Sequence, residues 1–318
     1  MLCKYQKKMN KCLYCYKPLK GEADFHKECS MGFFGSKHAP KLPYSIDQMS
    51  ELARIVVERS IAVPGVQAKL SMSLIKETQE TSDNRLTVVG ALGGGYIFKP
   101  PSEYYPEMPQ NEHLTMRLAE VFGIRVVPSS LIRLASGELS YITRRIDRKG
   151  EGEKIHMIDM FQITEAFDKY KSSMEKIGKA LRNYSANPLL DILFLFELTL
   201  LSFLTGNNDM HLKNFSMIDS VSGWILSPAY DLLNVTIINP KDEEELALTM
   251  QGKKKKIKRE HFEVFGEGLG LMPKQMSGVF NRFYKNKAEA IQWINNSFLS
   301  AKMKEAYTDL LEERYARI

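Results

Sequence analysis

Cysteine is scarce in this chain, and its placement excludes one class of fold. Four of the 318 residues are cysteines, and all four lie within the first 29 positions. A disulfide framework that spans the fold is therefore excluded, and this usage is typical of proteins kept in a reducing cytosol. The N-terminus also lacks the apolar core of a secretory signal peptide. From these absences we expect a cytoplasmic protein.

An uninterrupted apolar segment of membrane-spanning length is missing as well. The most apolar run, residues 189–204, is interrupted by Asp191 and Glu197. A transmembrane helix needs about 20 consecutive apolar residues. We therefore expect this run to form a buried core helix, and we expect no membrane partner.

The chain has no strong excess of one charge. Its formal net charge is +6, with 26% charged and 44% apolar residues, which are ordinary values for a globular protein. Such a balance excludes a dedicated nucleic-acid-wrapping protein. It still favours an anionic partner such as a nucleotide, RNA or DNA.

Residue patterns divide the chain into three regions. Residues 1–45 form a small cysteine-bearing appendage, 46–146 carry strand signals, and 147–318 are mostly helical in period. Strands are expected at KLSMSLIKE, RLTVVG, YIF, IRVVPSSLIRL and ELSYITRRID, and a helix at NEHLTMRLAEVFG. Further helices are expected at MIDMFQITEAF, around KIGKALRNYS, in the long apolar run, and near 273–283 and 287–317. The pattern predicts an α+β fold with two lobes and a cleft between them.

A dense polar cluster, GNNDMHLKNFSM at 206–217, follows the long apolar run. Asp209 and Asn214 are five residues apart, the spacing at which phosphoryl-transfer enzymes place a carboxylate that orients a hydroxyl and an amide that binds Mg²⁺. FSMIDS-VSG-WILSPAYDLLN then predicts a hairpin that leads to Asp231. The oxygen pair of Asn214 and Asp231 suits Mg²⁺.

Two other interpretations of this cluster stay open on the residues alone. An Asn- and Asp-rich helix C-terminus, with Asp231 as an ordinary turn residue, has the same composition. A zinc site at His211 is disfavoured because no second His or Cys lies nearby.

The strand-rich region offers partners for such a loop. Lys99 ends an apolar strand, where a phosphate-binding lysine is expected, and Glu112 lies near the start of the next helix, where it could pair with that lysine. A strand-end lysine and a glutamate in a first helical turn are also common without function. VPGVQAK at 63–69 is not a G-x-G-x-x-G loop, and a simple Pro-Gly turn explains it equally well.

The N-terminal appendage carries metal-ligand spacing. Cys12-x-x-Cys15 is followed by His26 and Cys29, which together could close a tetrahedral Zn²⁺ site. Four protein ligands leave no open position, so the metal would be structural. The alternative is free thiols in a partly ordered tail.

A basic run, KKKKIKR at 253–259, follows the acidic DEEE at 242–245. It is either a contact for DNA or an RNA-bound substrate, or a solvated loop partly neutralised by the acidic residues. We favour the solvated loop.

In this order, VPGVQAKLSMSL, YIFKPP, NEHLTMRLA, ITRRIDR, GNNDMHLKNFSM and PAYDLLN resemble the motifs of the HipA-type toxin serine/threonine kinases. The resemblance runs from about residue 60 to about residue 260, and G-N-x-D-x-H-x-K-N-F-S matches over eleven positions. It implies a bilobal protein-kinase-like fold, ATP and Mg²⁺ as cofactors, and a role as the toxin of a toxin–antitoxin module.

The resemblance also implies a role for each matching residue. Asp209 would be the catalytic base, with His211 and Lys213 beside it and Lys213 neutralising phosphate charge. Asn214 and Asp231 would hold Mg²⁺. The ATP contacts would come from Lys99 with Glu112, from the loop residues Val63, Gly65, Gln67 and Lys69, and from the backbone of Arg144 and Ile146 at the adenine.

Two departures from the family pattern affect these expectations. The chain resembles a short, split form in which the N-terminal subdomain is a separate small protein. The serine that often precedes the loop glycine is replaced by Ala62, Val63 and Pro64, with Ser60 further upstream, so the resemblance leaves open whether this chain inactivates itself by that route through Ser60.

The implied partners are a protein substrate such as an aminoacyl-tRNA synthetase, and a small antitoxin or the separate subdomain protein. DNA would be contacted only through an antitoxin. Two alternatives are a catalytically silent, kinase-like regulator that binds a nucleotide or an antitoxin, and a small-molecule kinase. The full set of Asp209, Asn214 and Asp231 argues against the silent regulator.

Overall fold

The computed structural model describes residues 10–49, 51–52, 69–76, 84–89, 94–102, 104–105, 107–149 and 153–318. The chain splits into two compact units. The first, here called the strand-rich unit, comprises Met1–Gln110 and Pro128–Arg145. The second, the helical unit, comprises Asn111–Val127 and Ile146–Ile318. The two-unit division places no boundary at residue 45 and assigns residues 111–127 to the helical unit.

An antiparallel sheet organises the strand-rich unit. Its strand order is β2-β1-β3-β5-β4, and every neighbouring pair is antiparallel. All five strands expected from the sequence are confirmed: β1 (Leu70–Lys76), β2 (Asn84–Val89), β3 (Tyr96–Lys99), β4 (Ser129–Arg133) and β5 (Leu139–Arg144).

The core of this unit combines the sheet with the N-terminal segment. Helix α1 (Lys27–Phe34) places Phe33 and Phe34 among buried sheet residues that include Tyr96, Phe98 and Ile142. The rings of Phe33 and Phe34 meet edge to face, with their centroids 4.7 Å apart, a favourable aromatic geometry. The described part of residues 10–45 therefore shares the core of the sheet.

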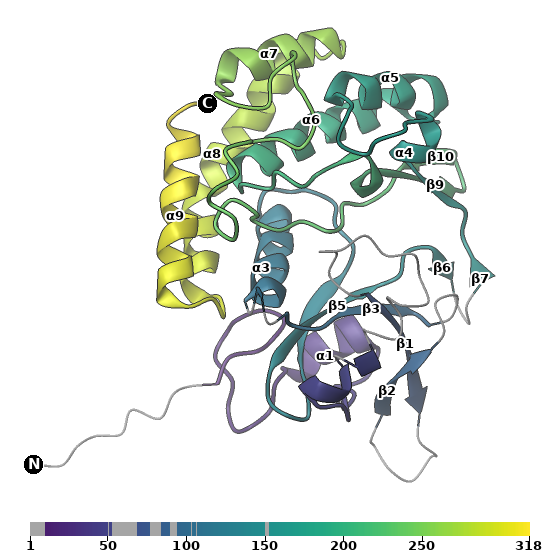
Figure 1. Ribbon diagram of the computed structural model, residues 1–318. Coiled ribbons are helices and arrows are strands. Elements are labelled where there is room, and N and C mark those ends of the chain that lie inside the picture. Colours follow the sequence, from purple (N-terminus) through teal and green to yellow (C-terminus); the bar gives the residue numbers. More distant parts are fainter. Residues whose placement is uncertain are drawn as a thin grey trace, which may run out of the picture. The chain divides into compact units, whose positions relative to one another are not determined.

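Helices form most of the second unit (Figure 1). They are α3 (Met108–Val121), α5 (Met174–Tyr184), α6 (Pro188–Leu204), α7 (Arg259–Gly268), α8 (Pro273–Asn296) and α9 (Ala301–Tyr315). The first three residues of α3 fall in the strand-rich unit, and the rest of the helix falls in the helical unit. Within the helical unit, Thr115 of α3 hydrogen-bonds Tyr307 of α9, with 2.9 Å between their hydroxyl oxygens.

The expected buried helix is α6. Pro188 occupies its first turn, where a missing N–H costs nothing, and Phe196 packs against aromatic rings of α7 and α8. The two charges that interrupt the run are paired. Asp191 accepts from the Leu226 N–H at 2.7 Å, and Glu197 lies 2.6 Å from Arg282. Among the described helices, none has the length and apolarity to cross a membrane.

Two helical expectations need correction. MIDMFQITEAF is not one helix: it forms strand β8 (Met157–Asp159) and a single turn, α4 (Met160–Ile163). Asp159 ends the strand because its side chain caps the Gln162 N–H at 2.9 Å. Near the C-terminus the break falls at 297–300 rather than at 284–286, because Ser300 caps the first turn of α9.

Two small sheets complete the helical unit. β8 pairs with β9 (Ser216–Ser220), which pairs with β10 (Gly223–Leu226), all antiparallel. β6 (Arg148–Lys149) and β7 (Glu153–Lys154) form a separate two-stranded ladder. The hairpin expected after the polar cluster is therefore confirmed as β9 and β10.

Candidate functional site

Helix α6 ends in a turn that leads directly into the polar cluster. Thr205 is its C-cap, and Gly206 follows in the left-handed region with φ 68°. The Gly206 N–H donates to the Phe203 carbonyl at 3.3 Å, and the Asn207 N–H donates to the Ser202 carbonyl at 2.8 Å. This pair of bonds is a Schellman motif, which satisfies the last helix carbonyls and turns the chain sharply.

The backbone at Gly206 is closely surrounded. A Cβ atom there would lie 2.5 Å from Leu310 Cδ2 and 2.7 Å from Asn234 Oδ1. The Gly206 carbonyl also accepts from the Val235 and Thr236 N–H groups, at 3.0 and 3.1 Å. The start of the polar cluster is thus held against the segment that follows Asp231.

Asp209 and Asn214 are in contact through a hydrogen bond. Asn214 ends the short 3₁₀ turn η1 (Leu212–Asn214), and its Nδ2 donates to the Asp209 backbone carbonyl at 2.9 Å. The His211 N–H donates to the same carbonyl at 2.8 Å. Because the amide nitrogen of Asn214 is used in this way, its oxygen is the atom that remains for a cation.

The β9–β10 hairpin returns the chain to this loop. The Tyr230 hydroxyl donates to the Lys213 carbonyl at 3.0 Å and lies 2.6 Å from the Ser216 hydroxyl. The next residue, Asp231, has φ 61°, a left-handed conformation that is uncommon for non-glycine residues but that aspartate adopts more readily than most. Burial lowers the pKa of His211, and the charge of Asp231 acts on the same imidazole in the opposite direction. Asp209, Asn214 and Asp231 are therefore brought to one end of the hairpin.

The donors here fit the cation that a kinase uses. Asn214 and Asp231 offer an amide and a carboxylate oxygen, the hard ligands that Mg²⁺ prefers. Three polar atoms of the loop are also buried without a hydrogen-bond partner among the described residues: Asn207 Nδ2, Asn208 Oδ1 and His211 Nδ1. Buried polar groups are rarely left unpaired, so these atoms suit a site that binds a polar ligand.

His211 is buried, and its surroundings keep its imidazole uncharged. Burial lowers the pKa of its imidazole, and the charge of Lys169 lowers it further, whereas Asp209 and Asp231 raise it, with a net lowering. Its ring packs edge to face against Tyr170, with the ring centroids 5.1 Å apart. His211 therefore forms a neutral wall beside Asp209.

Tyr170 is a site residue that the sequence patterns do not reveal. Its hydroxyl donates to Asp209 Oδ1 at 2.7 Å. Burial, and next the hydrogen bond to the Asp209 carboxylate, raise the pKa of Tyr170, so the phenol keeps its proton. It lies 39 residues before Asp209, in the loop between α4 and α5, and no local pattern marks it.

Lys213 lies on the outer side of the loop. Its side chain is exposed, with Nζ 4.9 Å from the centre of the Phe161 ring, within range of a cation–π contact. An exposed ammonium beside Asp209 and Asn214 is able to reach an anionic ligand.

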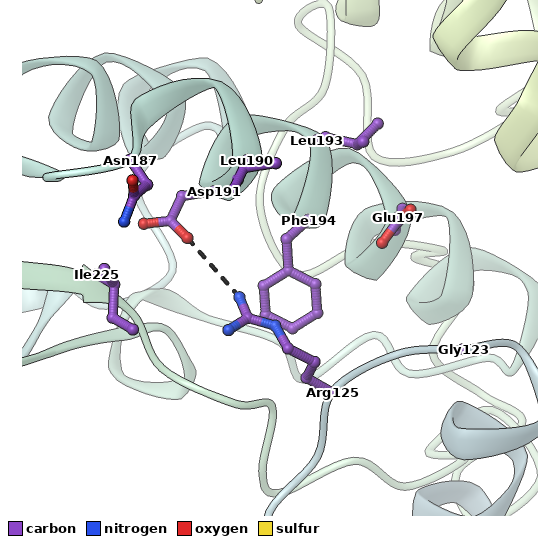
Figure 2. A pocket seen from close by; sticks show the side chains of 9 residues that line it. All are labelled: Gly123, Arg125, Asn187, Leu190, Asp191, Leu193, Phe194, Glu197 and Ile225. Atoms are coloured by element: carbon purple, nitrogen blue, oxygen red, sulfur yellow. Dashed lines mark ion pairs between the residues drawn. The ribbon is translucent and has the colours of Figure 1, made fainter. Parts of the chain in front are cut away.

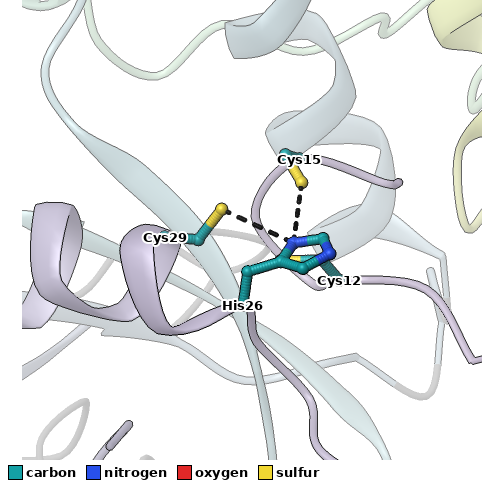
Figure 3. Close-up of side chains that lie close together, drawn as sticks. All are labelled: Cys12, Cys15, His26 and Cys29. Atoms are coloured by element: carbon teal, nitrogen blue, oxygen red, sulfur yellow. Dashed lines mark hydrogen bonds between the residues drawn. The ribbon is translucent and has the colours of Figure 1, made fainter. Parts of the chain in front are cut away.

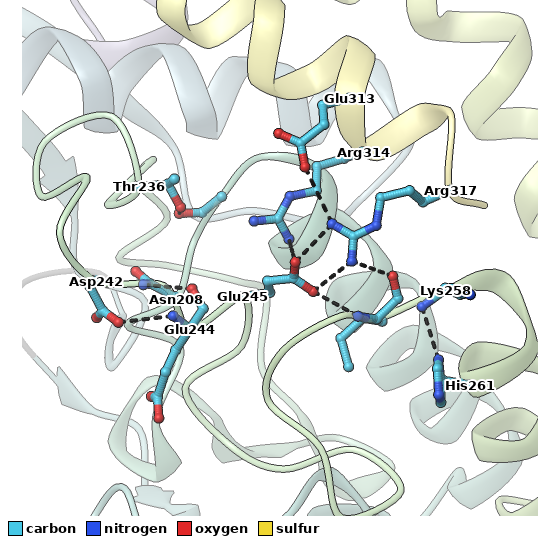
Figure 4. Close-up of polar contacts among 12 residues, drawn as sticks. Asn208, Thr236, Asp242, Glu244, Glu245, Lys258, His261, Glu313, Arg314 and Arg317 are labelled. Carbon is cyan, nitrogen blue, oxygen red and sulfur yellow. Dashed lines mark hydrogen bonds and ion pairs between the residues drawn. The ribbon is translucent and has the colours of Figure 1, made fainter.

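A second layer of contacts supports the loop from the C-terminal end of the chain (Figure 4). Asn208 Nδ2 donates to the Glu244 carbonyl at 2.9 Å. The neighbouring Glu245 accepts from Arg317 Nη1 and Nη2, at 2.8 and 2.9 Å, and from the Ile257 N–H at 2.8 Å. Arg314, which is buried, lies 3.5 Å from the same carboxylate. We call Glu245, Arg314 and Arg317 the C-terminal clamp.

Glu112 is buried on α3, one residue after Asn111. Asn111 Oδ1 accepts from the Asn234 N–H at 2.8 Å, and Asn111 Nδ2 donates to the Asn234 carbonyl at 2.9 Å. This two-bond contact ties the start of α3 to the segment three residues beyond Asp231.

The remaining predicted residues belong to the strand-rich unit or lie at its end. Lys99 is buried at the end of β3, with its Nζ 5.4 Å from the centre of the Tyr141 ring. Lys69 is exposed just before β1, and Arg144, which ends β5, and Ile146, two residues further on, are half-buried. Val63, Gly65 and Gln67, like the upstream Ser60, lie outside the described residues. The pairing of Lys99 with Glu112 stays a prediction.

The four predicted zinc ligands are brought together. One ligand atom from each of Cys12, Cys15, His26 and Cys29 lies within 4.8 Å of the others (Figure 3). This group can hold a metal ion. It is the one such cluster found among the described residues.

A separate pocket of about 410 Å³ lies beside the first turns of α6 (Figure 2). Arg125 lies 3.7 Å from Asp191 there and stacks over Phe194 at 4.5 Å. None of the predicted site residues line this pocket. Its charged groups are paired, Arg125 with Asp191 and Glu197 with Arg282. The pocket lies between α6 and the segment that follows α3, away from the polar cluster.

Two lysines of the basic run pair with the acidic segment, so the run is partly neutralised as expected. Lys254 lies 3.1 Å from Glu244, and Lys255 lies 3.0 Å from Glu243. The acidic and basic segments therefore form one cross-linked loop.

Solved structures identify the fold as kinase-like. The HipA chain of a Shewanella oneidensis toxin–antitoxin complex with HipB and operator DNA matches with a TM-score of 0.67 and 23% identity, over 80% of this chain and 64% of that one. A Helicobacter pylori proinflammatory kinase, CtkA, matches with a TM-score of 0.52 and 15% identity, over 70% of this chain and 87% of that one. The α+β, kinase-like class predicted from the sequence is confirmed.

The amino-acid sequence assigns the chain to a protein family. The model of the HipA-like C-terminal domain matches residues 61–291, which is more than half of the chain. This protein belongs to the HipA-like C-terminal domain family.

Curated relatives agree with this assignment. A Haemophilus influenzae protein named as a candidate kinase is 29% identical over 246 residues, covering 72% of this chain and 69% of that protein. The Shewanella oneidensis serine/threonine-protein kinase toxin HipA is 24% identical over 253 residues, covering 73% of this chain and 56% of that protein. This chain thus spans less than two thirds of the length of the Shewanella relative.

Proposed function

We propose that this protein is an ATP- and Mg²⁺-dependent serine/threonine protein kinase. The observation that carries the proposal is the contact between Asn214 Nδ2 and the Asp209 carbonyl at 2.9 Å, together with the hairpin that returns Asp231 to the same loop. A solvated turn would not need this arrangement, whereas phosphoryl transfer needs a carboxylate and two metal ligands at fixed positions.

Each of these residues would have a distinct task. Asp209 would orient the substrate hydroxyl and accept its proton, while Tyr170 holds one oxygen of the carboxylate. Asn214 and Asp231 would bind Mg²⁺ through their oxygens. When bound, Mg²⁺ and ATP supply the transferable phosphoryl group and neutralise its charge. Lys213 would add positive charge beside the transferred group.

The strand-rich unit would supply the nucleotide contacts. Lys99 would bind the ATP phosphates and pair with Glu112, and Lys69 would end the phosphate loop that contains Val63, Gly65 and Gln67. The backbone of Arg144 and Ile146 would contact adenine. A Zn²⁺ ion at the Cys/His cluster would be structural and take no part in transfer, because four protein ligands leave no position for substrate.

The family supports a proposal for the biological setting. We propose a cytoplasmic toxin of a toxin–antitoxin module, whose protein substrate is a translation component such as an aminoacyl-tRNA synthetase. The Shewanella relative was solved with HipB and operator DNA, which supports a small antitoxin as partner, with DNA contacted only through it. A separate subdomain protein is a second candidate partner.

Phosphate transfer by an Asp209→Asn variant tests the proposal. Loss of the base should lower transfer from labelled ATP to protein by at least about a hundredfold and remove growth inhibition on induced expression. Asp219→Asn is the matched control, because Asp219 is exposed on β9, and it should behave as wild type. An Asp209→Asn protein that still transfers phosphate and arrests growth would refute the mechanism.

Two further measurements complete the test. Phosphoproteomics after induction, with the Asp209 variant as reference, identifies the substrate. A wild-type chain that binds ATP without transferring phosphate would instead support the silent, kinase-like regulator.

A further inference from the structure

The N-terminal Cys/His cluster has the geometry of a closed metal site. The Nδ1 atom of His26 lies 3.4 Å from Cys15 Sγ and 3.8 Å from Cys29 Sγ, and Cys12 Sγ completes the group within 4.8 Å. Around a tetrahedral Zn²⁺ with Zn–S near 2.3 Å and Zn–N near 2.0 Å, neighbouring ligand atoms stand roughly 3.5–3.8 Å apart. Three cysteines and one histidine are an established structural zinc set.

A second contact selects the His26 tautomer that can bind a metal ion through Nδ1. His26 Nε2 lies 3.0 Å from the Pro18 carbonyl oxygen. A carbonyl can only accept, so Nε2 carries the hydrogen and Nδ1 presents its lone pair to the three sulfur atoms (Figure 3). Metal-binding histidines are typically held by such a bond from the other ring nitrogen.

Local backbone structure presents each pair of ligands. The Tyr16 N–H donates to the Cys12 carbonyl at 2.9 Å, and Tyr16 adopts φ 59°, so a tight turn places Cys12 and Cys15 side by side. His26 is the N-cap of α1 and Cys29 lies in its first turn, so the start of the helix presents both ligands on the same side. The turn and the helix start converge on one point.

The cluster is connected to the sheet through α1. Phe33 and Phe34, at the other end of this helix, are buried in the core of the strand-rich unit. Arg144, the last residue of β5, donates from Nε to the Phe33 carbonyl at 2.7 Å and from Nη2 to the Gly32 carbonyl at 3.1 Å. Its guanidinium therefore caps the C-terminus of α1.

A third link joins the cluster to the outer strand of the sheet. Leu13, inside the Cys12–Cys15 turn, accepts at its carbonyl from the Leu131 N–H of β4 at 3.4 Å. Asp24 pairs with Arg133 of the same strand at 3.0 Å. Both ends of the ligand set are thus fastened to the sheet.

We propose that Cys12, Cys15, His26 and Cys29 bind one Zn²⁺ ion, and that this ion fixes α1 against the sheet and so holds Arg144 in place. The metal is then an integral part of the strand-rich unit rather than of a separate appendage. Any effect of the ion on adenine binding at the Arg144 backbone rests on the proposed kinase function. The metal site and its effect on α1 do not.

Metal content and Co²⁺ spectroscopy of the purified full-length chain test the site. We expect one zinc per wild-type chain, and on replacement by Co²⁺ the thiolate charge-transfer and d–d bands of a tetrahedral site. Cys15→Ser and Cys29→Ser should each lower zinc affinity by more than about a hundredfold. Loss of a residue that only hydrogen-bonds a metal ligand lowers affinity by less than that. Cys3→Ser, the fourth cysteine of the chain, is the matched control and should keep one zinc.

The structural role is tested by hydrogen exchange before and after chelation. Removal of zinc should lower amide protection in α1 (Lys27–Phe34) and β5 (Leu139–Arg144), while α6 (Pro188–Leu204) in the helical unit stays protected. Arg144→Gln should lower protection of α1 with zinc content unchanged.

The outcomes separate the claims. A wild-type chain without zinc and without tetrahedral Co²⁺ bands overturns the site, even if the cysteine variants fail to fold. So does a Cys29→Ser chain that retains full zinc. Unchanged protection of α1 and β5 after chelation overturns the fixing role. A zinc-bound chain that fails to bind ATP overturns the kinase proposal and leaves the metal site standing.

Discussion

The Tyr170 hydroxyl donates to Asp209 Oδ1 at 2.7 Å. Its raised pKa keeps the phenol protonated, so the bond holds the carboxylate by one oxygen and leaves the other for a substrate hydroxyl. A residue from the loop before α5 therefore orients the proposed catalytic base.

Replacing Tyr170 by Phe tests this orientation. One hydrogen bond to a charged carboxylate, of about 1.5–3 kcal/mol, is lost, which corresponds to a fall in kcat of roughly ten- to a hundredfold, with KM for ATP unchanged. The measurement is steady-state phosphate transfer at varied ATP concentration. Tyr184→Phe is the control, because Tyr184 is 59% exposed, and it should match wild type. Equal kcat values for the two variants would show that Tyr170 has no positioning role.

Gly206→Ala should destabilise the helical unit strongly. Alanine in the left-handed region costs about 1–2 kcal/mol, and the Cβ contact 2.5 Å from Leu310 adds about 1–3 kcal/mol of overpacking. Urea unfolding followed by circular dichroism measures the sum.

Gly252→Ala separates these two terms. Gly252 has φ 72°, and nothing lies within 4 Å of the position that a Cβ atom would take there, so only the backbone cost of about 1–2 kcal/mol applies. If both variants lose the same free energy of unfolding, the close approach at Gly206 does not constrain the loop.

Breaking the C-terminal clamp should be costly and should loosen the loop. Glu245→Gln leaves the buried Arg314 and the partly buried Arg317 without their anion, which costs about 3–5 kcal/mol in the free energy of unfolding. Because Asn208 is held by the neighbouring Glu244 carbonyl, kcat should fall as well. Glu263→Gln, which breaks the exposed pair with Arg259 at 2.8 Å, should cost roughly 0.5 kcal/mol or less.

The same clamp predicts a pH dependence. Burial raises the pKa of Glu245, but hydrogen bonds from Arg317 and from the Ile257 N–H lower it more, and the net direction is down. A depressed carboxyl pKa stabilises the fold above the unfolded value of about 4.3. This contribution is lost as pH falls through the folded value. Between pH 7 and pH 3 the free energy of unfolding should therefore change less with pH in Glu245→Gln than in wild type. The same pH dependence in both proteins would contradict the clamp.

Local patterns predicted the elements well where one period was unambiguous. Alternation identified β1 and β2, a short apolar segment after a glycine turn identified β3, and the long apolar run identified α6. MIDMFQITEAF was misjudged because an 11-residue apolar segment fits both periods until Asp159, acting as an N-cap, divides it. The break before α9 was misplaced for a similar reason, since the helical period continues through 284–286 without a stop signal.

The candidate site divides in the same way. The D-x-x-x-x-N spacing and the C-x-x-C and H-x-x-C pairs could be read directly, because short separations along a turn or helix start determine which side chains meet. Short spacings could not reveal the roles of Tyr170, Asn208 and Glu245, because their contacts join segments about 36 to 72 residues apart.

The sequence alone determined the residue types of the polar cluster after α6, the Cys/His cluster and the helix that precedes the polar cluster, since these depend on local spacing and local burial. Only the tertiary structure decided which oxygen of Asp209 is held, which nitrogen of His26 faces the sulfur atoms, and that α1 lies in the core of the sheet. Those outcomes depend on hydrogen-bond direction and packing between distant segments, which become defined only when the chain has folded.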